Sequence, residues 1–282
     1  MKRALIMEGG AMRGMFTCGV IDVFMENEIV FDGAIGVSAG AVFGCNYKSR
    51  QIDRAIRYNK RFARDPRYCS LRSWIRTGNL YGDDFCYRIL PDILDPFDRE
   101  AFRRNPMPFH VVATDIVTGE PVFHLCTDGG KEDIEWMRAS SSMPLVSRPV
   151  TLDGHLLLDG GISDPIPYAF MDAQGYDRNV VILTQPEGYR KKRSAAMPLM
   201  RLFMRKYPAI VSAMAERHLV YNAQTAEVAR QESLGRVLVL RPPKPLGISR
   251  TESDPEELER VYQVGRAEAL RRMEDIKAFL KG

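Results

Sequence analysis

The sequence predicts an α/β fold in which helices cover a mostly parallel sheet. In the N-terminal third, short apolar runs alternate with segments whose apolar residues recur at helical spacing. Two glycine-rich turns each join such a run to such a segment, in the order strand, tight turn and helix. The sequence contains no internal repeat and no low-complexity linker, so we expect a single domain.

The expected elements of the N-terminal third follow in order. A buried strand at 3–7 leads through the first glycine-rich turn into a helix at 15–27. A second strand at 31–36 leads through the second turn into a helix at 39–47. A third helix is expected at 51–64, with Ile52, Ile56 and Phe62 on its apolar side.

The rest of the chain gives fewer regular patterns. Residues 65–107 are rich in proline and predict one short helix near 84–90. Further on, the patterns predict a hairpin of 109–116 and 121–125, a helix at 131–140, and strands at 156–158, 179–184 and 236–240. Asp254 and Pro255 predict the start of a last helix, with an apolar stripe from Leu258 to Leu280.

Composition sets limits on the class of protein. The chain has 282 residues, of which 45% are hydrophobic and 27% charged, as in an ordinary globular protein. This excludes a disordered, a collagen-like and a multi-span membrane protein. The net charge of +4 is too small to predict nucleic-acid binding, although it permits contact with anionic lipid.

Targeting signals and cysteines bear on the compartment. The apolar run after Lys2 and Arg3 stops at Glu8, which is too short for a signal peptide. The five cysteines are odd in number and include no C-x-x-C pair. We therefore expect reduced thiols in a cytoplasmic protein.

The second glycine-rich turn has the form G-x-S-x-G, with Gly36 and Gly40 flanking Ser38. In such a turn the glycines permit a sharp reversal, and the serine hydroxyl is raised above the sheet at a helix N-terminus. The strand expected before it and the helix expected after it favour a nucleophile. The alternative is a close-packed turn whose serine only caps the helix.

The first glycine-rich turn permits three interpretations. It could bind a dinucleotide, but the second strand ends in the serine turn instead of the required acid. It could be a close-packing turn. The preferred interpretation is an oxyanion hole, because consecutive N–H groups at a helix N-terminus stabilise developing negative charge. The residues concerned are Gly9, Gly10, Ala11, Met12, Arg13 and Gly14.

A serine nucleophile needs a base, and an aspartate is the preferred candidate. Asp159 follows an apolar strand and precedes Gly160 and Gly161, which allow close approach. Asp128 begins a second D-G-G, but its charged surroundings predict a surface loop, and an ordinary turn remains the alternative for Asp159 too. None of the four histidines stands in a recognisable catalytic context; they are His110, His124, His155 and His218.

Together these motifs resemble the signature of patatin-like phospholipases. The order GGAMRG at 9–14, GVSAG at 36–40 and DGG at 159–161 fits, as does ASSSMP at 139–144. The resemblance covers roughly residues 3–185 and implies a three-layer α/β/α patatin-like fold. We expect a catalytic core at 3–185, with C-terminal helices and one strand at 186–282 packed on the same domain.

The resemblance also implies a mechanism. Ser38 would be the nucleophile and Asp159 the base of a dyad without histidine, metal or cofactor. Gly9, Gly10 and Ala11 would supply oxyanion N–H groups, and Arg13 would order that loop. Two departures are that Ala11 stands where the family often has glycine, and Asp164 where it often has asparagine.

The expected activity is hydrolysis of carboxylic ester bonds in lipids or phospholipids. Two alternatives stay open: a lipid- or partner-binding module with little turnover, and a thioesterase or carboxylesterase acting on soluble esters. No residue pattern indicates an oligomeric state.

Residues 190–206 predict a second kind of partner. Basic residues alternate there with long apolar ones, and the segment has no acid. Such a pattern suits peripheral contact with an anionic membrane. The alternative is a solvated loop followed by a helix packed on the sheet. The basic residues are Arg190, Lys191, Lys192, Arg193, Arg201, Arg205 and Lys206.

Overall fold

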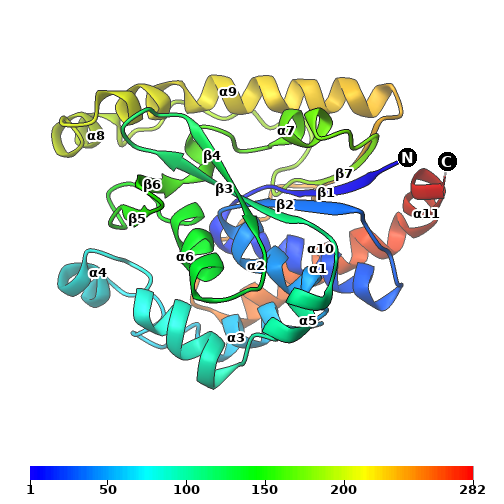
Figure 1. Ribbon diagram of the computed structural model, residues 1–282, viewed down its shortest axis with the longest axis horizontal. Coiled ribbons are helices and arrows are strands. Elements are labelled where there is room, and N and C mark those ends of the chain that lie inside the picture. The colour runs from blue at the N-terminus through cyan, green and yellow to red at the C-terminus, as the bar shows by residue number, and fades with distance from the viewer. Residues whose placement is uncertain (282) are drawn as a thin grey trace.

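The computed structural model describes residues 1–281 and has an eight-stranded sheet at its centre (Figure 1). The strand order is β5-β6-β3-β2-β1-β7-β8, and β4 pairs with β3 outside this path. The run from β3 to β8 is parallel, while β4 and β6 are antiparallel to β3. The strands are β1 (Arg3–Met7), β2 (Gly33–Val37), β3 (Phe109–Asp115), β4 (Pro121–Cys126), β5 (Val150–Leu152), β6 (His155–Asp159), β7 (Arg178–Ile182) and β8 (Val237–Leu240).

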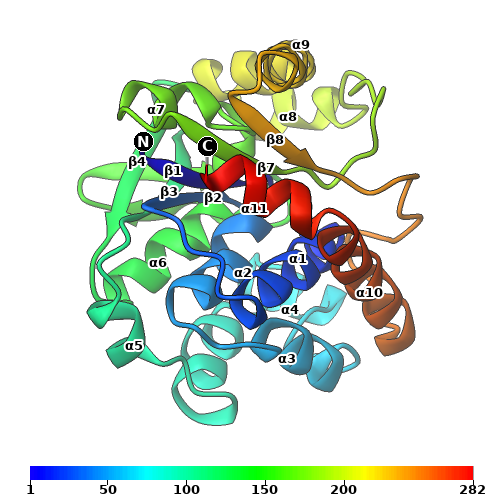
Figure 2. The same cartoon turned by 90° about the vertical axis from the view of Figure 1, so that its right-hand side faces the viewer.

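Helices cover both faces of this sheet, which confirms the predicted three-layer fold (Figures 1 and 2). On one face lie α7 (Tyr168–Ala173) and α9 (Pro208–Ser233). On the other lie α1 (Met15–Glu26), α2 (Ala39–Lys48) and α10 (Pro255–Arg271). The remaining helices are α3 (Arg54–Phe62), α4 (Leu71–Thr77), η2 (Phe85–Leu94), α5 (Arg99–Arg104), α6 (Lys131–Ser140), α8 (Met197–Phe203) and α11 (Met273–Lys281), with short 3₁₀ turns η1 (Ala11–Gly14) and η3 (Gly160–Ile162).

Strand β1 shows why its sequence is apolar throughout. Leu5 and Met7 pack into the core on the α1 and α2 side, whereas Ala4 and Ile6 pack into the core on the α7 and α9 side. Side chains alternate between the faces of a strand, so a strand buried on both faces needs apolar residues at every position.

The edge of β3 places two strand ends next to each other. Strand β2 pairs with β3 up to Val37 opposite Val112, and β6 pairs with β3 from Asp159 opposite Ala113. Since β4 occupies the other edge of β3 along this stretch, β6 continues along the edge that β2 leaves. The residues after β2 and at the end of β6 therefore meet.

The structure corrects several expected elements. The third helix begins at Arg54, so Ile52 precedes it and is 39% exposed instead of lying on its apolar side. The last helix is broken into α10 and α11, and Leu270 near the break is exposed. Sequence patterns also missed α4, α5, β5 and α7, and they predicted C-terminal helices in 186–282 without giving the bounds of the long helix α9. Helix α9 buries only a narrow stripe of its surface, so most of its residues are not core residues and its sequence shows little apolar periodicity.

Within residues 1–281, no helix is both long enough and apolar enough to cross a membrane.

Candidate active site

Ser38 occupies a strained turn between β2 and α2. Its φ of +55° and ψ of −120° lie in a region that costs an L-residue about 1–3 kcal/mol. The Ser38 N–H donates a hydrogen bond of 2.9 Å to the Ser140 hydroxyl at the end of α6. This conformation is the sharp strand-to-helix reversal that the G-x-S-x-G pattern predicts.

The two glycines that flank Ser38 are required by close backbone contacts. A Cβ on Gly36 would lie 2.3 Å from the Gly40 carbonyl oxygen. A Cβ on Gly40 would lie 2.3 Å from the Met7 carbonyl oxygen. Any side chain at either position would therefore force β1, β2 and α2 apart.

The glycine-rich loop lies directly beside Ser38, because β1 and β2 are parallel neighbours. A Cβ on Gly9 would lie only 2.7 Å from Ser38 Cβ. The N–H groups of Gly9 and Gly10 donate no hydrogen bond to any residue from 1 to 281. Ala11 has a φ of +50°, a left-handed conformation that glycine adopts more easily.

A buried carboxylate holds this loop in place. Glu8 accepts a hydrogen bond of 2.6 Å from the Thr184 N–H, and the Thr184 hydroxyl lies 3.0 Å from the Gly9 carbonyl oxygen. Both residues are almost fully buried. The only sequence signal for this anchor is a single acid between an apolar strand and a glycine run.

Asp159 ends β6 and is buried. Its N–H donates to the Ser142 carbonyl oxygen at 2.8 Å, and its Oδ1 accepts from the Gly161 N–H at 2.8 Å. The stretch 139–144 therefore touches both halves of the site, through the Ser140 hydroxyl and the Ser142 carbonyl.

The second carboxylate oxygen of Asp159 has no hydrogen-bond partner among residues 1–281. Burial raises the pKa of Asp159, and the positive charge of Arg217 and the nearby Ser38 hydroxyl lower it in part. The Ser38 hydroxyl lies close enough to the Asp159 carboxylate to lower its pKa, although the two side chains do not form a hydrogen bond of normal geometry. Asp159 is thus a more basic carboxylate than usual, with one oxygen available.

Arg217 on α9 is a site residue that sequence reasoning missed. Its Nε donates a 2.5 Å hydrogen bond to the Gly161 carbonyl oxygen, so its guanidinium lies against the D-G-G turn. Arg217 follows Gly161 by 56 residues and belongs to no motif, and only the folded chain brings the two together.

The alternative bases lie elsewhere. Asp128 stands in an exposed loop, where its side chain accepts from the Gly130 N–H at 2.7 Å. His124 pairs with Asp133 and His155 with Asp115. Among the described residues, no histidine lines the cavity that contains Ser38.

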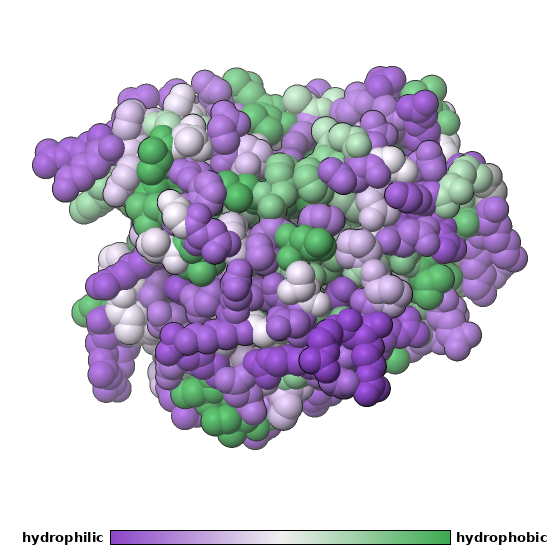
Figure 3. All heavy atoms as spheres, viewed as in Figure 1, coloured by the Kyte–Doolittle hydropathy of each residue, from purple (hydrophilic) through white to green (hydrophobic). Residues whose placement is uncertain are grey.

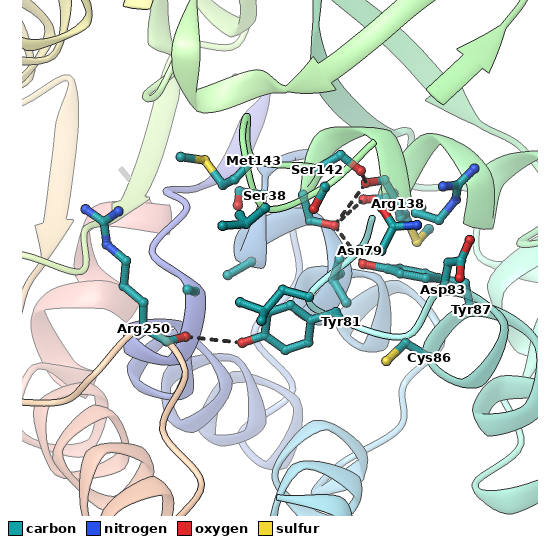
Figure 4. Close-up of a pocket in the computed structure, with 18 of the residues that line it drawn as sticks. Ser38, Asn79, Tyr81, Asp83, Cys86, Tyr87, Arg138, Ser142, Met143 and Arg250 are labelled. Carbon is teal, nitrogen blue, oxygen red and sulfur yellow. Dashed lines mark hydrogen bonds between the residues drawn. The ribbon is translucent and has the colours of Figure 1, made fainter. Parts of the chain in front are cut away.

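This cavity has a volume of about 400 Å³ and opens beside Ser38 (Figure 4). Its walls are mainly apolar and come from α2, η2, α6, α8 and α9. Volume and lining suit a small apolar ligand or part of a lipid. Wall residues include Met12, Val42, Phe43, Tyr81, Met137, Met143, Leu145, Met200 and Met214.

One group in residues 1–281 has metal-ligand atoms close together: His124, Cys126 and Asp133. The Asp133 carboxylate already accepts from the backbone N–H groups of residues 127, 128 and 129 and contacts His124 at 3.1 Å. These hydrogen bonds account for the burial of Asp133, which anchors the turn before α6.

Comparison with known proteins identifies the family. The model of patatin-like phospholipases matches residues 5–172, more than half of the chain. The chain belongs to the patatin-like phospholipase family. A second model, a domain of unknown function (DUF6363), matches residues 207–281.

Individual relatives are only partly similar. The "uncharacterized protein YjjU" of Escherichia coli (strain K12) is 36% identical over 193 residues, covering 65% of this chain and 52% of that protein. The "uncharacterized NTE family protein" Mb1092c of Mycobacterium bovis is 30% identical, covering 64% and 48%. "Lysophospholipase nte1" of Aspergillus oryzae is 25% identical, covering 97% of this chain and 18% of that protein. This chain spans about half the length of the first two.

Among solved structures, VipD from Legionella pneumophila matches with a TM-score of 0.47 and 12% identity, covering 97% of this chain and 67% of that one.

Proposed function

We propose that this protein is a serine acyl hydrolase that cleaves carboxylic ester bonds of lipids, with Ser38 as nucleophile and Asp159 as base. The observation that carries the proposal is the meeting of two strand ends. A strained serine at the mouth of an apolar cavity lies beside a buried aspartate, one of whose oxygens has no hydrogen-bond partner in residues 1–281. We assign the catalytic core to 3–185, and we place 186–282 on the same domain.

In the first step, the Ser38 hydroxyl attacks the ester carbonyl carbon and its proton passes to Asp159. The negative charge on the former carbonyl oxygen is stabilised by the N–H groups of Gly9, Gly10 and Ala11. The intermediate then collapses: the C–O bond to the alcohol breaks, and the alcohol leaves with the proton from Asp159. Water then gives a proton to Asp159 and attacks the acyl carbon; the bond from that carbon to Ser38 Oγ breaks, the fatty acid is released, and the proton returns from Asp159 to Ser38.

Buried surroundings support this role for Asp159. A carboxylate with an ordinary pKa is a weak base at neutral pH. Burial raises the pKa of Asp159, so its ionised form takes a proton more readily. The positive charge of Arg217 lowers that pKa in part and so favours the ionised form that a general base requires.

The test is Ser38→Ala, assayed with a short-chain p-nitrophenyl ester and with a fluorophosphonate probe. We expect a folded protein that loses hydrolysis by about 10³-fold or more and no longer reacts with the probe. Ser49→Ala, which removes a buried hydroxyl just after α2 that bonds to the Asn46 carbonyl oxygen, is a control for the loss of a buried serine hydroxyl away from the site.

Full turnover by folded Ser38→Ala would contradict the nucleophile. A wild-type protein that binds lipid but neither hydrolyses esters nor reacts with the probe would favour the alternative of a binding module.

We also propose that the protein contacts membranes peripherally through α8. Three large apolar side chains of this helix, Leu199, Leu202 and Phe203, are 51%, 61% and 68% exposed. Exposed Arg201, Arg205 and Lys206 lie beside them. Such a surface combines apolar insertion with roughly 1 kcal/mol of attraction per basic residue to anionic lipid.

Helix α4 extends this apolar surface on the other side of the cavity. Helices α4 and α8 lie at the same end of the molecule, and the surface is notched there (Figures 1 and 3). Leu71, Trp74 and Ile75 of α4 are exposed. The basic run 190–193 is less continuous than its sequence predicts, because Lys191 turns inward and stacks on Tyr221.

Vesicle co-sedimentation tests this contact. Leu202→Glu with Phe203→Glu should strongly reduce binding to vesicles with anionic lipid, because both apolar insertion and charge attraction are lost. Leu234→Glu alters an equally exposed leucine at the far end of α9 and should bind as the wild type does. Equal co-sedimentation of the wild type and both variants would contradict the proposed membrane contact and indicate that α8 is an ordinary solvated helix.

A further inference from the structure

The cavity beside Ser38 continues along two neighbouring helices. On α2, Val42 and Cys45 follow Ser38 at intervals of four and three residues, and all three line the cavity. Residues at such intervals share one face of a helix, so α2 presents a single face to the cavity along two turns. The lining residues of α6 also recur at helical spacing: Ile134, Met137, Arg138 and Ser141.

The two helices run in opposite directions along this cavity. Helix α2 begins immediately after Ser38, whereas α6 ends at Ser140, whose hydroxyl accepts the Ser38 N–H at 2.9 Å. Cys45 and Ile134 therefore lie at the end remote from Ser38, where both are buried in the same hydrophobic core. A rise of about 1.5 Å per residue puts that end about 10 Å from Ser38. We call this part of the cavity, from Ser38 to Cys45 and Ile134, the α2–α6 channel.

Buried side chains close the remote end of the α2–α6 channel. The Arg54 guanidinium donates a 3.0 Å hydrogen bond to the side chain of Asn46, the residue that follows Cys45 on α2. This guanidinium lies 5.3 Å from the ring centres of both Tyr58 and Phe97. Arg54, Tyr58 and Phe97 line the cavity and are each only 4% exposed. The channel therefore stops at packed core side chains instead of opening to solvent there.

We propose that the α2–α6 channel binds the acyl chain of the ester and limits this chain to about eight to ten carbons. Carbon–carbon bonds of about 1.5 Å advance an extended chain by about 1.25 Å per bond, so eight to ten carbons span about 10 Å. A palmitoyl chain would need about twice that length. The inference rests on the proposed hydrolase function and narrows its substrate class from lipids in general to medium-chain esters.

The position and the walls of the channel favour the acyl chain over the alcohol as its occupant. The channel begins at Ser38, and the acyl chain is the part of the ester that stays attached to this serine in the acyl-enzyme. Its walls are mainly apolar, with Val42, Phe43 and Met137 between its two ends. An unbranched hydrocarbon chain gains most from burial against such walls.

The first test measures kcat/KM for p-nitrophenyl esters from acetate to palmitate in the same neutral detergent. Each further methylene group that the channel buries should raise kcat/KM by up to about fourfold. We expect a maximum at about eight to ten carbons and a fall of about tenfold or more by palmitate, because a longer chain must displace packed core side chains. A profile that keeps rising to palmitate would overturn the length limit.

A larger side chain part-way along the channel should shorten the preferred chain. Val42 lies one turn beyond Ser38, about 6 Å along α2. Val42→Phe should lower the ratio of kcat/KM for the octanoate ester to that for the acetate ester by about tenfold or more, and this ratio cancels any effect on the nucleophile itself. Val264→Phe is the matched control, because it makes the same change at a half-buried position of α10 that does not line the cavity. It should keep the wild-type ratio.

A smaller side chain at the remote end should lengthen the preferred chain. Ile134→Ala removes three carbon atoms there, so the ratio of kcat/KM for the laurate ester to that for the octanoate ester should rise several-fold. A loss of stability alone does not produce such a gain. Ile276→Ala, the same change at a buried position of α11 that does not line the cavity, should keep the wild-type ratio. Unchanged ratios in both Val42→Phe and Ile134→Ala would overturn the channel.

A binding measurement separates this inference from the hydrolase proposal. By calorimetry, Ser38→Ala should bind decanoate, and adding Val42→Phe should weaken that binding about tenfold. If the wild type hydrolyses none of the esters, the hydrolase proposal fails while calorimetry still tests the channel. Equal affinity for decanoate in Ser38→Ala with and without Val42→Phe would show that the chain binds elsewhere, and the proposal would then be wrong.

Discussion

The tripeptide Asp-Gly-Gly occurs twice in this chain, and its two copies have opposite environments. Asp128 is exposed in the loop before α6, and its carboxylate bonds only to the Gly130 N–H of its own turn. Asp159 is buried at a strand end, beside Ser38 and Arg217, with one oxygen unpartnered in residues 1–281. The same three residues form a local turn in one place and a candidate base in the other.

What separates the two copies is the sheet. Asp159 is the last residue of β6. This strand pairs with the same edge of β3 as β2 does and begins where β2 ends, so the tripeptide lies beside Ser38. Asp128 follows the end of β4, where Cys126 lies opposite Phe109 at the start of β3, whereas Asp159 lies opposite Ala113 toward the other end of that strand, beside the end of β2. The tripeptide alone therefore carries little information, while its strand and that strand's partner decide the chemistry.

The largest expected difference is in catalysis. Asp159→Asn should lower kcat/KM for a p-nitrophenyl ester by about 10³-fold or more, because the amide cannot take the serine proton and dyad members act as a unit. Asp128→Asn should stay within about twofold of the wild type, since its carboxylate contacts only its own loop. An inactive Asp128→Asn with an active Asp159→Asn would reverse the assignment.

This preference for Asp159 was available from the sequence, because an apolar run before one D-G-G and charges after the other predict their different burial. The elbow at Ser38 and the loop at Gly9 were predictable for a similar reason. Their glycines and their flanking apolar runs each lie within a few residues, and the alternation of strands and helices predicts that β1 and β2 pair in parallel. Local patterns therefore gave the layered fold and the candidate nucleophile.

The rest of the site depends on contacts between distant segments. Arg217 and Arg250 lie 56 and 89 residues after Gly161, on elements without a motif, and Glu8 meets Thr184 only because β1 and β7 are neighbours. The sequence predicted C-terminal helices but not the bounds of α9, since this helix buries a narrow stripe and its other faces are polar. Lys191 was assigned to a basic surface, but packing on Tyr221 turns it inward.

A second difference between the two copies is in stability. A Cβ on Gly160 would lie 2.1 Å from the Val112 carbonyl oxygen, so Gly160→Ala must push β3 and β6 apart. We expect a loss of about 3 kcal/mol in the free energy of unfolding, measured by urea denaturation. In the exposed copy, a Cβ on Gly130 would meet the Asp128 side chain, which can move aside.

Gly130→Ala, at the third position of the exposed tripeptide, is therefore a control for adding a methyl group to an Asp-Gly-Gly turn, with an expected loss of about 0.5 kcal/mol or less. Equal losses for the two alanine variants would mean that the strand contact at Gly160 relaxes easily, and the contrast between the two copies would then be confined to catalysis.

The smallest expected effect is a shift in the pH dependence of hydrolysis. Asp159 acts only when ionised, so kcat/KM for a neutral ester should fall toward acidic pH through its pKa, which burial raises above the usual value near 3.9. The positive charge of Arg217 lowers that pKa. Arg217→Gln removes this charge, so the pKa rises and the acidic midpoint should move to higher pH. Lys244→Gln, a change of the same charge on an exposed loop, should leave the midpoint in place. A merely structural role for Arg217 at Gly161 would lower the rate at every pH without moving the midpoint, and a shift toward lower pH would contradict the assignment of Asp159 as the base.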